Sequence, residues 1–295
     1  MIKVNNKPIS INRFNDLTLN IKSPETDERI IILTWHYEND SEFFPLACLT
    51  RKFQSLERDV ILYLPYVPNA RMDRVENDED IFTLKYFCEL INNLHFKSVY
   101  VLDVHSTVSA GLLDNCILLK SDDYLNQAIQ TIYELENDTD HKNLYMFYPD
   151  EGAMKRYQKW TNLHFGFGIK NRDWNTREIV GYDLYGLTEQ DIKGKNFLIQ
   201  DDICATGGTI YQAAKRLKEM GANHIYVFAT HTENCTIFDG KLGECRESLL
   251  ETGLIEKMFT TNSVFDKDDN FLNEENLIAE KMEIYDVTLK WKFAI

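Results

Sequence analysis

The sequence has no long apolar run, no closely spaced cysteine pair and no excess of basic residues. No stretch approaches the roughly 18 apolar residues of a membrane-spanning helix, so no membrane span is predicted. The six cysteines are scattered without a CxxC pair, which argues against a zinc site and against a disulfide framework. The 47 acidic residues outnumber the 32 basic ones, and this balance disfavours nucleic acid as a partner.

The first residues, MIKVNNKPISINRF, also lack the apolar core and the cleavage site of a secretory signal. We therefore expect a cytoplasmic location. The composition, 44% hydrophobic and 27% charged, fits a globular enzyme or binding protein. A local basic pocket for a phosphorylated small molecule is compatible with the overall negative charge.

The most informative stretch is 196–214, NFLIQDDICATGGTIYQAA. A short apolar run ends at Asp201 and Asp202, and a Thr-Gly-Gly-Thr loop follows before a helical pattern. This order predicts a strand, an anion-binding loop and a helix, because glycines let successive N–H groups turn inward at a helix N-terminus. Taken alone, the motif also fits a Gly-rich turn whose aspartates cap the helix. The P-loop pattern is absent, since no Gly-Lys-Ser/Thr follows.

Apolar runs alternate with helical patterns along the whole chain, which predicts an α/β fold with mainly parallel sheets. The polar stretch 136–143, ENDTDHKN, is the best candidate boundary between two halves, 1–138 and 139–295. The alternating segment 282–293, MEIYDVTLKWKF, predicts a final strand, which we expect to return to the first half.

Charged residues follow several predicted strands. Arg71, Asp73 and Arg74 follow the strand at 60–64, where they favour polyphosphate binding, although an exposed ion-pair loop is an equal alternative. His105 follows the strand at 99–102 with Asp103. Magnesium prefers oxygen ligands, so the residue pattern favours a structural histidine there.

Asp150 follows the predicted strand 144–148 and begins a helix that carries Lys155 and Arg156, so it also fits a helix N-cap. Lys170 and Arg172 lie one residue apart after the apolar segment 165–169, and in a strand both would point to one face. Such a pair can neutralise a transferring phosphoryl group, or it can protect a solvated edge strand.

The order of these motifs resembles the ribose-phosphate diphosphokinase family, the PRPP synthetases, over nearly the whole chain. The matching segments are Arg13–Asp16, Pro65–Arg74, Asp103–His105, Asp150–Arg156, Lys170–Arg172 and Asp201–Thr209. The resemblance implies two tandem phosphoribosyltransferase-like domains, of which the first binds ATP and mediates oligomerisation and the second carries the ribose-phosphate loop. A cytoplasmic homo-oligomer with small-molecule substrates is expected.

The resemblance also implies roles for individual residues. Phe14, Asp16, Arg71, Asp73, Arg74 and His105 would bind ATP. His105 and Asp150 would hold Mg²⁺, and Lys170 and Arg172 would stabilise the transferring diphosphoryl group. Asp201 and Asp202 would hold ribose hydroxyls, and the remaining residues of the ribose-phosphate loop are Ala205, Thr206, Gly207, Gly208 and Thr209. The implied reaction is attack of an anomeric hydroxyl on the β-phosphorus of MgATP, releasing AMP.

Three residues depart from the family pattern, and Ala205 is the one that bears on the acceptor. Ala205 replaces the last aspartate of the loop, Met72 replaces a glutamine, and Thr18 replaces the glutamate of the adenine segment. Alanine at 205 would admit an acceptor extended beyond its 5′-phosphate, and ADP-ribose is the natural candidate. Related viral proteins act on ADP-ribose in NAD salvage, and such an origin would place the chain in host cytoplasm. Free ribose 5-phosphate is favoured on family frequency.

Two further functions fit less of the sequence. A phosphoribosyltransferase would share the glycine loop but would leave Arg71–Arg74 and Asp103–His105 without a task. A non-catalytic subunit that uses the fold to build a regulatory oligomer would not need Lys170 and Arg172.

Overall fold

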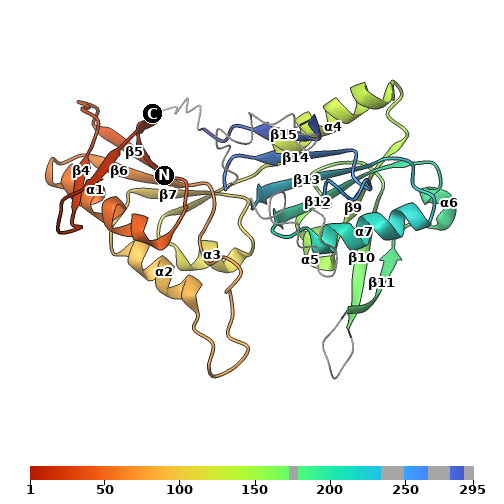
Figure 1. Cartoon of the computed structure of the whole chain (residues 1–295), viewed down its shortest axis with the longest axis horizontal. Coiled ribbons are helices and arrows are strands. Elements are labelled where there is room, and N and C mark those ends of the chain that lie inside the picture. Colours follow the sequence, from red (N-terminus) through yellow and green to blue (C-terminus); the bar gives the residue numbers. More distant parts are fainter. Residues whose placement is uncertain (173–178, 234–248, 265–279, 289–295) are drawn as a thin grey trace. The chain divides into compact units, whose positions relative to one another are not determined.

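The computed structural model describes residues 1–172, 179–233, 249–264 and 280–288. The chain forms two compact units, Met1–Lys120 joined by Val287 and Thr288, and Ser121–Asp286. Each contains a mainly parallel sheet flanked by helices (Figure 1), which confirms the predicted α/β class.

The sheet of the first unit has the strand order β2-β1-β5-β6-β7-β8. Strands β5 to β8 are parallel, whereas β1 is antiparallel to β2 and β5. A separate hairpin pairs β3 with β4. The strands are β1 Ile2–Val4, β2 Lys7–Pro8, β3 Ser10–Arg13, β4 Leu19–Lys22, β5 Ile30–Trp35, β6 Asp59–Leu64, β7 Ser98–Leu102 and β8 Cys116–Leu119. The helices are η1 Asp40–Glu42, α1 Phe43–Ser55, α2 Thr83–Asn92 and α3 Thr107–Leu112.

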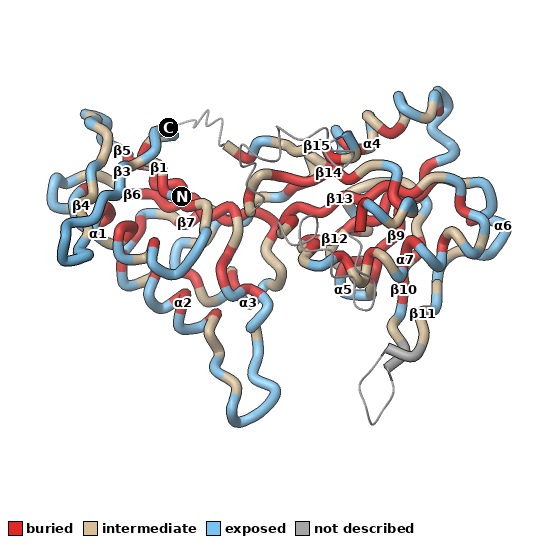
Figure 2. The backbone as a smooth tube through the Cα atoms, in the orientation of Figure 1, coloured by how far each residue is buried: buried red, intermediate tan, exposed pale blue. Residues whose placement is uncertain are grey.

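The core of this unit follows from hydrophobic periodicity. Helix α1 buries Leu46, Leu49 and Phe53, which recur every three or four residues and pack with strand residues such as Leu33 and Leu62. Strand β6 is buried on both faces, as expected for a central parallel strand. Figure 2 shows this as continuous red along the central strands.

The sheet of the second unit has the order β11-β10-β9-β12-β13-β14-β15. All neighbouring pairs are parallel except β10 and β11, which form an antiparallel edge ribbon. The strands are β9 Leu144–Tyr148, β10 Phe165–Arg172, β11 Ile179–Tyr185, β12 Asn196–Cys204, β13 Ile225–Thr232, β14 Lys257–Thr261 and β15 Met282–Tyr285. The helices are α4 Asp122–Glu136, α5 Glu151–Tyr157, α6 Glu189–Ile192 and α7 Gly208–Glu219.

Helix α4 belongs to the second unit, so the division at Lys120/Ser121 precedes the boundary at 138/139 expected from the sequence. Leu125 and Ile132 of α4 pack with Leu198 and Phe228 on one face of the sheet, whereas α7 covers the other face (Figure 1). The polar stretch 136–143 therefore connects α4 to β9 within one unit. Polar composition marked a surface connection here and not a domain boundary.

The last described strand, β15, pairs with β14 and does not return to the first unit. Only after Asp286 does the chain join the first unit, where the Tyr63 hydroxyl donates to the Val287 carbonyl oxygen at 3.2 Å. The rest of the predicted strand, 289–293, lies outside the described residues. Among the described residues, no helix has the length and apolar character to span a membrane.

Candidate functional site

The predicted anion loop lies between β12 and α7. Strand β12 extends to Cys204, so Asp201 and Asp202 are inside its carboxyl end, and Ala205 to Gly207 form the turn. Gly207 has φ +80° at the N-cap of α7, and a Cβ there would lie 3.1 Å from a Leu249 methyl carbon. Only glycine takes this conformation without strain. The turn therefore presents the unpaired N–H groups of the first turn of α7, an arrangement that suits a phosphate.

Lys170 reaches this loop from a different part of the chain. Its ammonium donates to the Thr209 hydroxyl oxygen at 2.7 Å, joining β10 to the first turn of α7. A cation and a helix N-terminus thus lie side by side. Arg172 ends β10 where the pairing with β11 shifts register, and its side chain lies outside the described residues.

Asp202 is nearly fully buried, with 4% of its surface exposed. One of its carboxylate oxygens lies 3.0 Å from Nη1 of Arg156 on α5, so the buried charge is paired. Arg156 lies in the segment Asp150–Arg156, which resembles the family pattern, but no role was predicted for it. In the sequence, Arg156 is recognisable only as a basic residue on the helix predicted after Asp150. Sequence alone does not distinguish such a residue from an ordinary surface charge.

Burial, followed by the neighbouring charges of Asp202 and Asp150, raises the pKa of Asp201 well above its ordinary value. Asp201 also accepts a hydrogen bond from the Asp202 N–H at 2.9 Å. Three carboxylates therefore influence one another around this strand end. A bound cation would relieve the repulsion.

Asp150 caps helix α5, because its side chain accepts from the Ala153 N–H at 2.8 Å. The N-cap predicted as the simple alternative is therefore present. Immediately before it, the Pro149 carbonyl oxygen accepts from the hydroxyl of Tyr182 on β11 at 2.8 Å. Tyr182 was not predicted as a site residue, since a tyrosine on an edge strand carries no sequence signal.

The predicted ATP-binding residues lie in the first unit. Arg71 and Arg74 are exposed on the loop after β6, and Nε of Arg74 lies 3.4 Å from a Glu76 carboxylate oxygen. Glu76, in the acidic segment 76–80 that follows, therefore forms an ion pair with Arg74. His105 is half-buried in the turn between β7 and α3.

Phe14 and Asp16 lie in the turn of the β3–β4 hairpin. The Phe14 ring is 57% exposed. Asp16 accepts from the Thr18 N–H at 3.0 Å and from the Thr18 hydroxyl at 2.6 Å, and the hydroxyl contact is the main cause of its lowered pKa. Thr18, which departs from the family pattern, thus fixes Asp16 in the turn.

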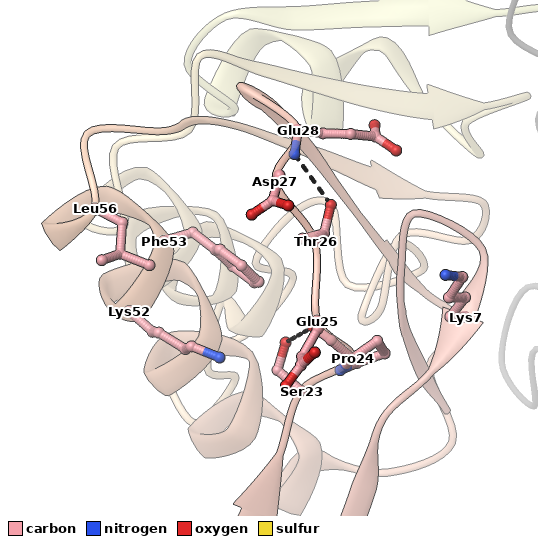
Figure 3. Close-up of a pocket in the computed structure, with 10 residues that line it drawn as sticks. All are labelled: Lys7, Ser23, Pro24, Glu25, Thr26, Asp27, Glu28, Lys52, Phe53 and Leu56. Atoms are coloured by element: carbon pink, nitrogen blue, oxygen red, sulfur yellow. Dashed lines mark hydrogen bonds between the residues drawn. The ribbon is translucent and has the colours of Figure 1, made fainter.

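A cavity of about 780 Å³ in the first unit is a separate feature (Figure 3). One wall is the segment Ser23–Glu28, with three carboxylates, and another is formed by Lys52, Phe53 and Leu56. The Glu28 N–H donates to the Thr26 hydroxyl within this wall. None of the predicted site residues is among its lining residues, and its three carboxylates against two lysines disfavour a polyphosphate.

Among the described residues, no group of three or more His, Cys, Asp or Glu side chains forms a metal site by itself. Mg²⁺ at nucleotide sites commonly uses one or two carboxylates together with substrate phosphates. Asp150 and Asp201 fit this pattern as oxygen donors, and the repulsion at Asp201 favours a cation. A histidine such as His105 is a poorer match for this hard cation.

Ribose-phosphate pyrophosphokinases match most of the chain. The protein of Pyrococcus furiosus is 25% identical over 230 residues, which cover 76% of this chain and 77% of the relative. That of Chlorobaculum tepidum is 29% identical over 229 residues, covering 76% and 66%, and that of Ureaplasma parvum is 25% identical over 295 residues, covering 97% and 86%. The chain is therefore a distant homologue of the ribose-phosphate pyrophosphokinases, at about 25% identity over most of its length.

The fold agrees with this relationship. The crystal structure of the phosphoribosylpyrophosphate synthetase from Mycobacterium smegmatis superposes with a TM-score of 0.68 at 18% identity, covering 95% of this chain and 86% of that chain. The predicted pair of phosphoribosyltransferase-like domains is thus confirmed as the fold of this ribose-phosphate pyrophosphokinase homologue. No family model matches its sequence.

Proposed function

We propose that this protein is a magnesium-dependent diphosphokinase that transfers the β,γ-diphosphoryl group of ATP to the anomeric hydroxyl of a ribose 5-phosphate unit. The observation that carries the proposal is the contact of 2.7 Å between Lys170 and Thr209. It places a cation at the edge of a loop suited to a phosphate, in a chain related to ribose-phosphate pyrophosphokinases.

The acceptor would bind at the carboxyl end of β12. The loop from Thr206 to Thr209 would hold its 5′-phosphate through N–H and hydroxyl donors. The carboxylates of Asp201 and Asp202 would accept hydrogen bonds from the ribose hydroxyls. Arg156, which pairs with Asp202, would keep that carboxylate oriented.

In the transfer, the anomeric oxygen bonds to the β-phosphorus while the bond from that phosphorus to the α,β-bridging oxygen breaks. AMP leaves with the bridging oxygen, and the hydroxyl proton passes to water. Lys170 and Arg172 would neutralise charge on the moving diphosphoryl group, since phosphoryl transfer depends mainly on positioning and electrostatics. Mg²⁺, with Asp150 as an oxygen donor, would supply further charge neutralisation when bound.

ATP would be held by the first unit. Arg71 and Arg74 would contact its phosphates, and Phe14 would stack on the adenine with Asp16 as a polar partner. Asp73 and His105 complete the proposed set. Binding requires Arg74 to exchange its Glu76 contact for a phosphate, which costs little because the pair is exposed.

The leading acceptor is free ribose 5-phosphate, and the second is ADP-ribose, which would give ADP-ribose pyrophosphate and serve NAD salvage. Ala205 supports the second acceptor, because it is a partly exposed small residue in the phosphate loop where the family pattern has an aspartate. A homo-oligomer is proposed for either reaction. A phosphoribosyltransferase is disfavoured because it would not use Arg71–Arg74, and a non-catalytic subunit because it would not need Lys170.

The test supplies MgATP with ribose 5-phosphate or ADP-ribose in turn and measures AMP. The proposal predicts AMP release that requires an acceptor and Mg²⁺. AMP only with ADP-ribose would reverse the order of acceptors. Absence of AMP release with both acceptors would refute the diphosphokinase activity. Release of pyrophosphate from PRPP in the presence of a nucleobase would indicate a phosphoribosyltransferase.

A further inference from the structure

The part of β10 that carries Lys170 extends beyond the central sheet. On one side, β10 pairs with β9 at Phe165–Phe167. On the other side, its pairing with β11 continues from Phe167 to Arg172. Residues Gly168–Lys170 therefore belong to a two-stranded ribbon, and such ribbons are only marginally stable without further support.

Tyr182 lies directly opposite Lys170 in this ribbon. Opposite residues of an antiparallel pair point to the same face, and Gly168 shares that face because it is two residues from Lys170. The Tyr182 side chain lies over Gly168: a Cβ at position 168 would be 1.9 Å from the tyrosine hydroxyl oxygen and 2.1 Å from its ring. The glycine therefore makes room for the tyrosine.

The Tyr182 hydroxyl donates to the Pro149 carbonyl oxygen at 2.8 Å, in the turn that leads into Asp150. Burial, followed by the charges of Asp150 and Asp201, raises the pKa of Tyr182, so the hydroxyl keeps its proton at neutral pH. This hydrogen bond ties the edge strand β11 to the turn after β9. The contact between Lys170 and Thr209 holds the same ribbon to α7.

We propose that Tyr182 is a positioning residue that supports the ribbon and keeps Lys170 at the phosphate loop. This inference rests on the function proposed above. Tyr182 acts on the reaction through Lys170 and Asp150, and its hydroxyl is the atom that matters, because the ring alone would fill the space over Gly168. Loss of the hydroxyl lowers the fraction of molecules in which Lys170 is correctly placed.

The test compares Tyr182→Phe with Tyr185→Phe. Tyr185 is a matched control because it lies on the same strand, is 46% exposed and stacks on Phe167. Tyr182→Phe should lower kcat about tenfold, while the KM for the acceptor changes less than about twofold and the melting temperature matches that of Tyr185→Phe. Equal kcat values in the two variants would overturn the proposal, as would a loss confined to KM.

A second variant reaches the same contact without altering the hydroxyl. Gly168→Ala must displace the Tyr182 side chain and should lower kcat at least as much as Tyr182→Phe. Gly111→Ala is its control, because a Cβ there meets no atom within 4 Å. Full activity in Gly168→Ala would contradict the role of Tyr182.

Hydrogen exchange separates this inference from the proposed function. The amides of Phe167 to Lys170 should exchange faster in Tyr182→Phe than in the wild type or Tyr185→Phe, with or without catalysis. Unchanged exchange would overturn the support by Tyr182 even in an active enzyme. A wild type without acceptor-dependent AMP release would instead refute the diphosphokinase activity, and the exchange rates would still decide whether Tyr182 supports the ribbon.

Discussion

The Lys170 ammonium donates to the Thr209 hydroxyl across 2.7 Å, and this contact joins two motifs that lie 39 residues apart in the sequence. Strand β10 supplies the cation, and the first turn of α7 supplies the hydroxyl next to the unpaired N–H groups. A phosphate at this loop would replace the hydroxyl as the partner of Lys170. The two motifs therefore lie together in the fold, although they are far apart in the sequence.

Lys170→Met should abolish most of the activity while leaving the fold intact. The variant keeps the aliphatic stem but removes the charge, so kcat should fall about 100- to 1000-fold, as when one electrostatic contact to a transition state is lost. Steady-state AMP release measures the effect. Lys155→Met is the control, because Lys155 is exposed and pairs only with Glu151 at 2.9 Å among the contacts of the described residues. Equal turnover of both variants would remove Lys170 from the mechanism.

Gly207→Ala should destabilise the protein by about 1–2 kcal/mol, because it forces an L side chain into φ +80° and against Leu249. Urea denaturation measures the change. Gly208→Ala is the matched comparison and should cost less, since a Cβ there lies 3.9 Å from its nearest neighbour, the Thr206 hydroxyl oxygen. Equal losses would show that the left-handed conformation at Gly207 is not required.

Asp201→Asn should stabilise the protein at neutral pH, while it lowers activity. The folded protein raises the pKa of Asp201, so ionisation of this carboxyl costs stability. This cost is absent below the ordinary value of 3.8 and grows as the pH rises toward the folded-state pKa. Urea denaturation between about pH 3.5 and 7.5 measures this cost in stability, because the series begins near the ordinary pKa of 3.8.

The stabilisation should therefore shrink toward the acidic end of that series. Asp114→Asn, at an exposed carboxylate of the first unit, should show no such trend. A gain that is independent of pH would contradict the repulsion around Asp201.

Arg156→Met should destabilise the protein by about 3 kcal/mol, because it leaves the buried Asp202 carboxylate without its cation. Replacing both partners, Arg156→Met with Asp202→Asn, should recover most of the loss. Thermal unfolding of the single and double variants forms the required cycle. A double variant as unstable as Arg156→Met would indicate that packing of Arg156, and not its charge, supports the site.

Strands with strong apolar character could be predicted from the sequence. The bounds of β9, Leu144–Tyr148, are those predicted, because Asn143 precedes this apolar run and Pro149 follows it. The end of the helix predicted after Asp150 is not evident from the sequence, and the structure places it at Tyr157. Beyond it, the Trp160 N–H bonds to the Tyr157 carbonyl, and the ring of Trp160 packs edge-on against that of Tyr157. A local turn between Tyr157 and Trp160 thus ends the helix.

The loop glycines and the carboxylates of the candidate site could also be predicted from the sequence, because backbone conformation and charge restrict which residue types occur there. Arg156 and Tyr182 were not, because their partners, Asp202 and Pro149, are distant in sequence or are backbone atoms. The contact between Arg74 and Glu76 was not predicted either, although both charged residues are evident in the sequence. Sequence identified the kinds of groups at the site, and the structure supplied their pairing.

Tracing the β-phosphorus tests the central claim most directly. ATP labelled at this atom is incubated with Mg²⁺, the protein and each acceptor, and the products are separated. We predict label in a new acceptor diphosphate and unlabelled AMP in equal amount. Label that remains in ADP, or that appears only as free phosphate or diphosphate, would contradict diphosphoryl transfer.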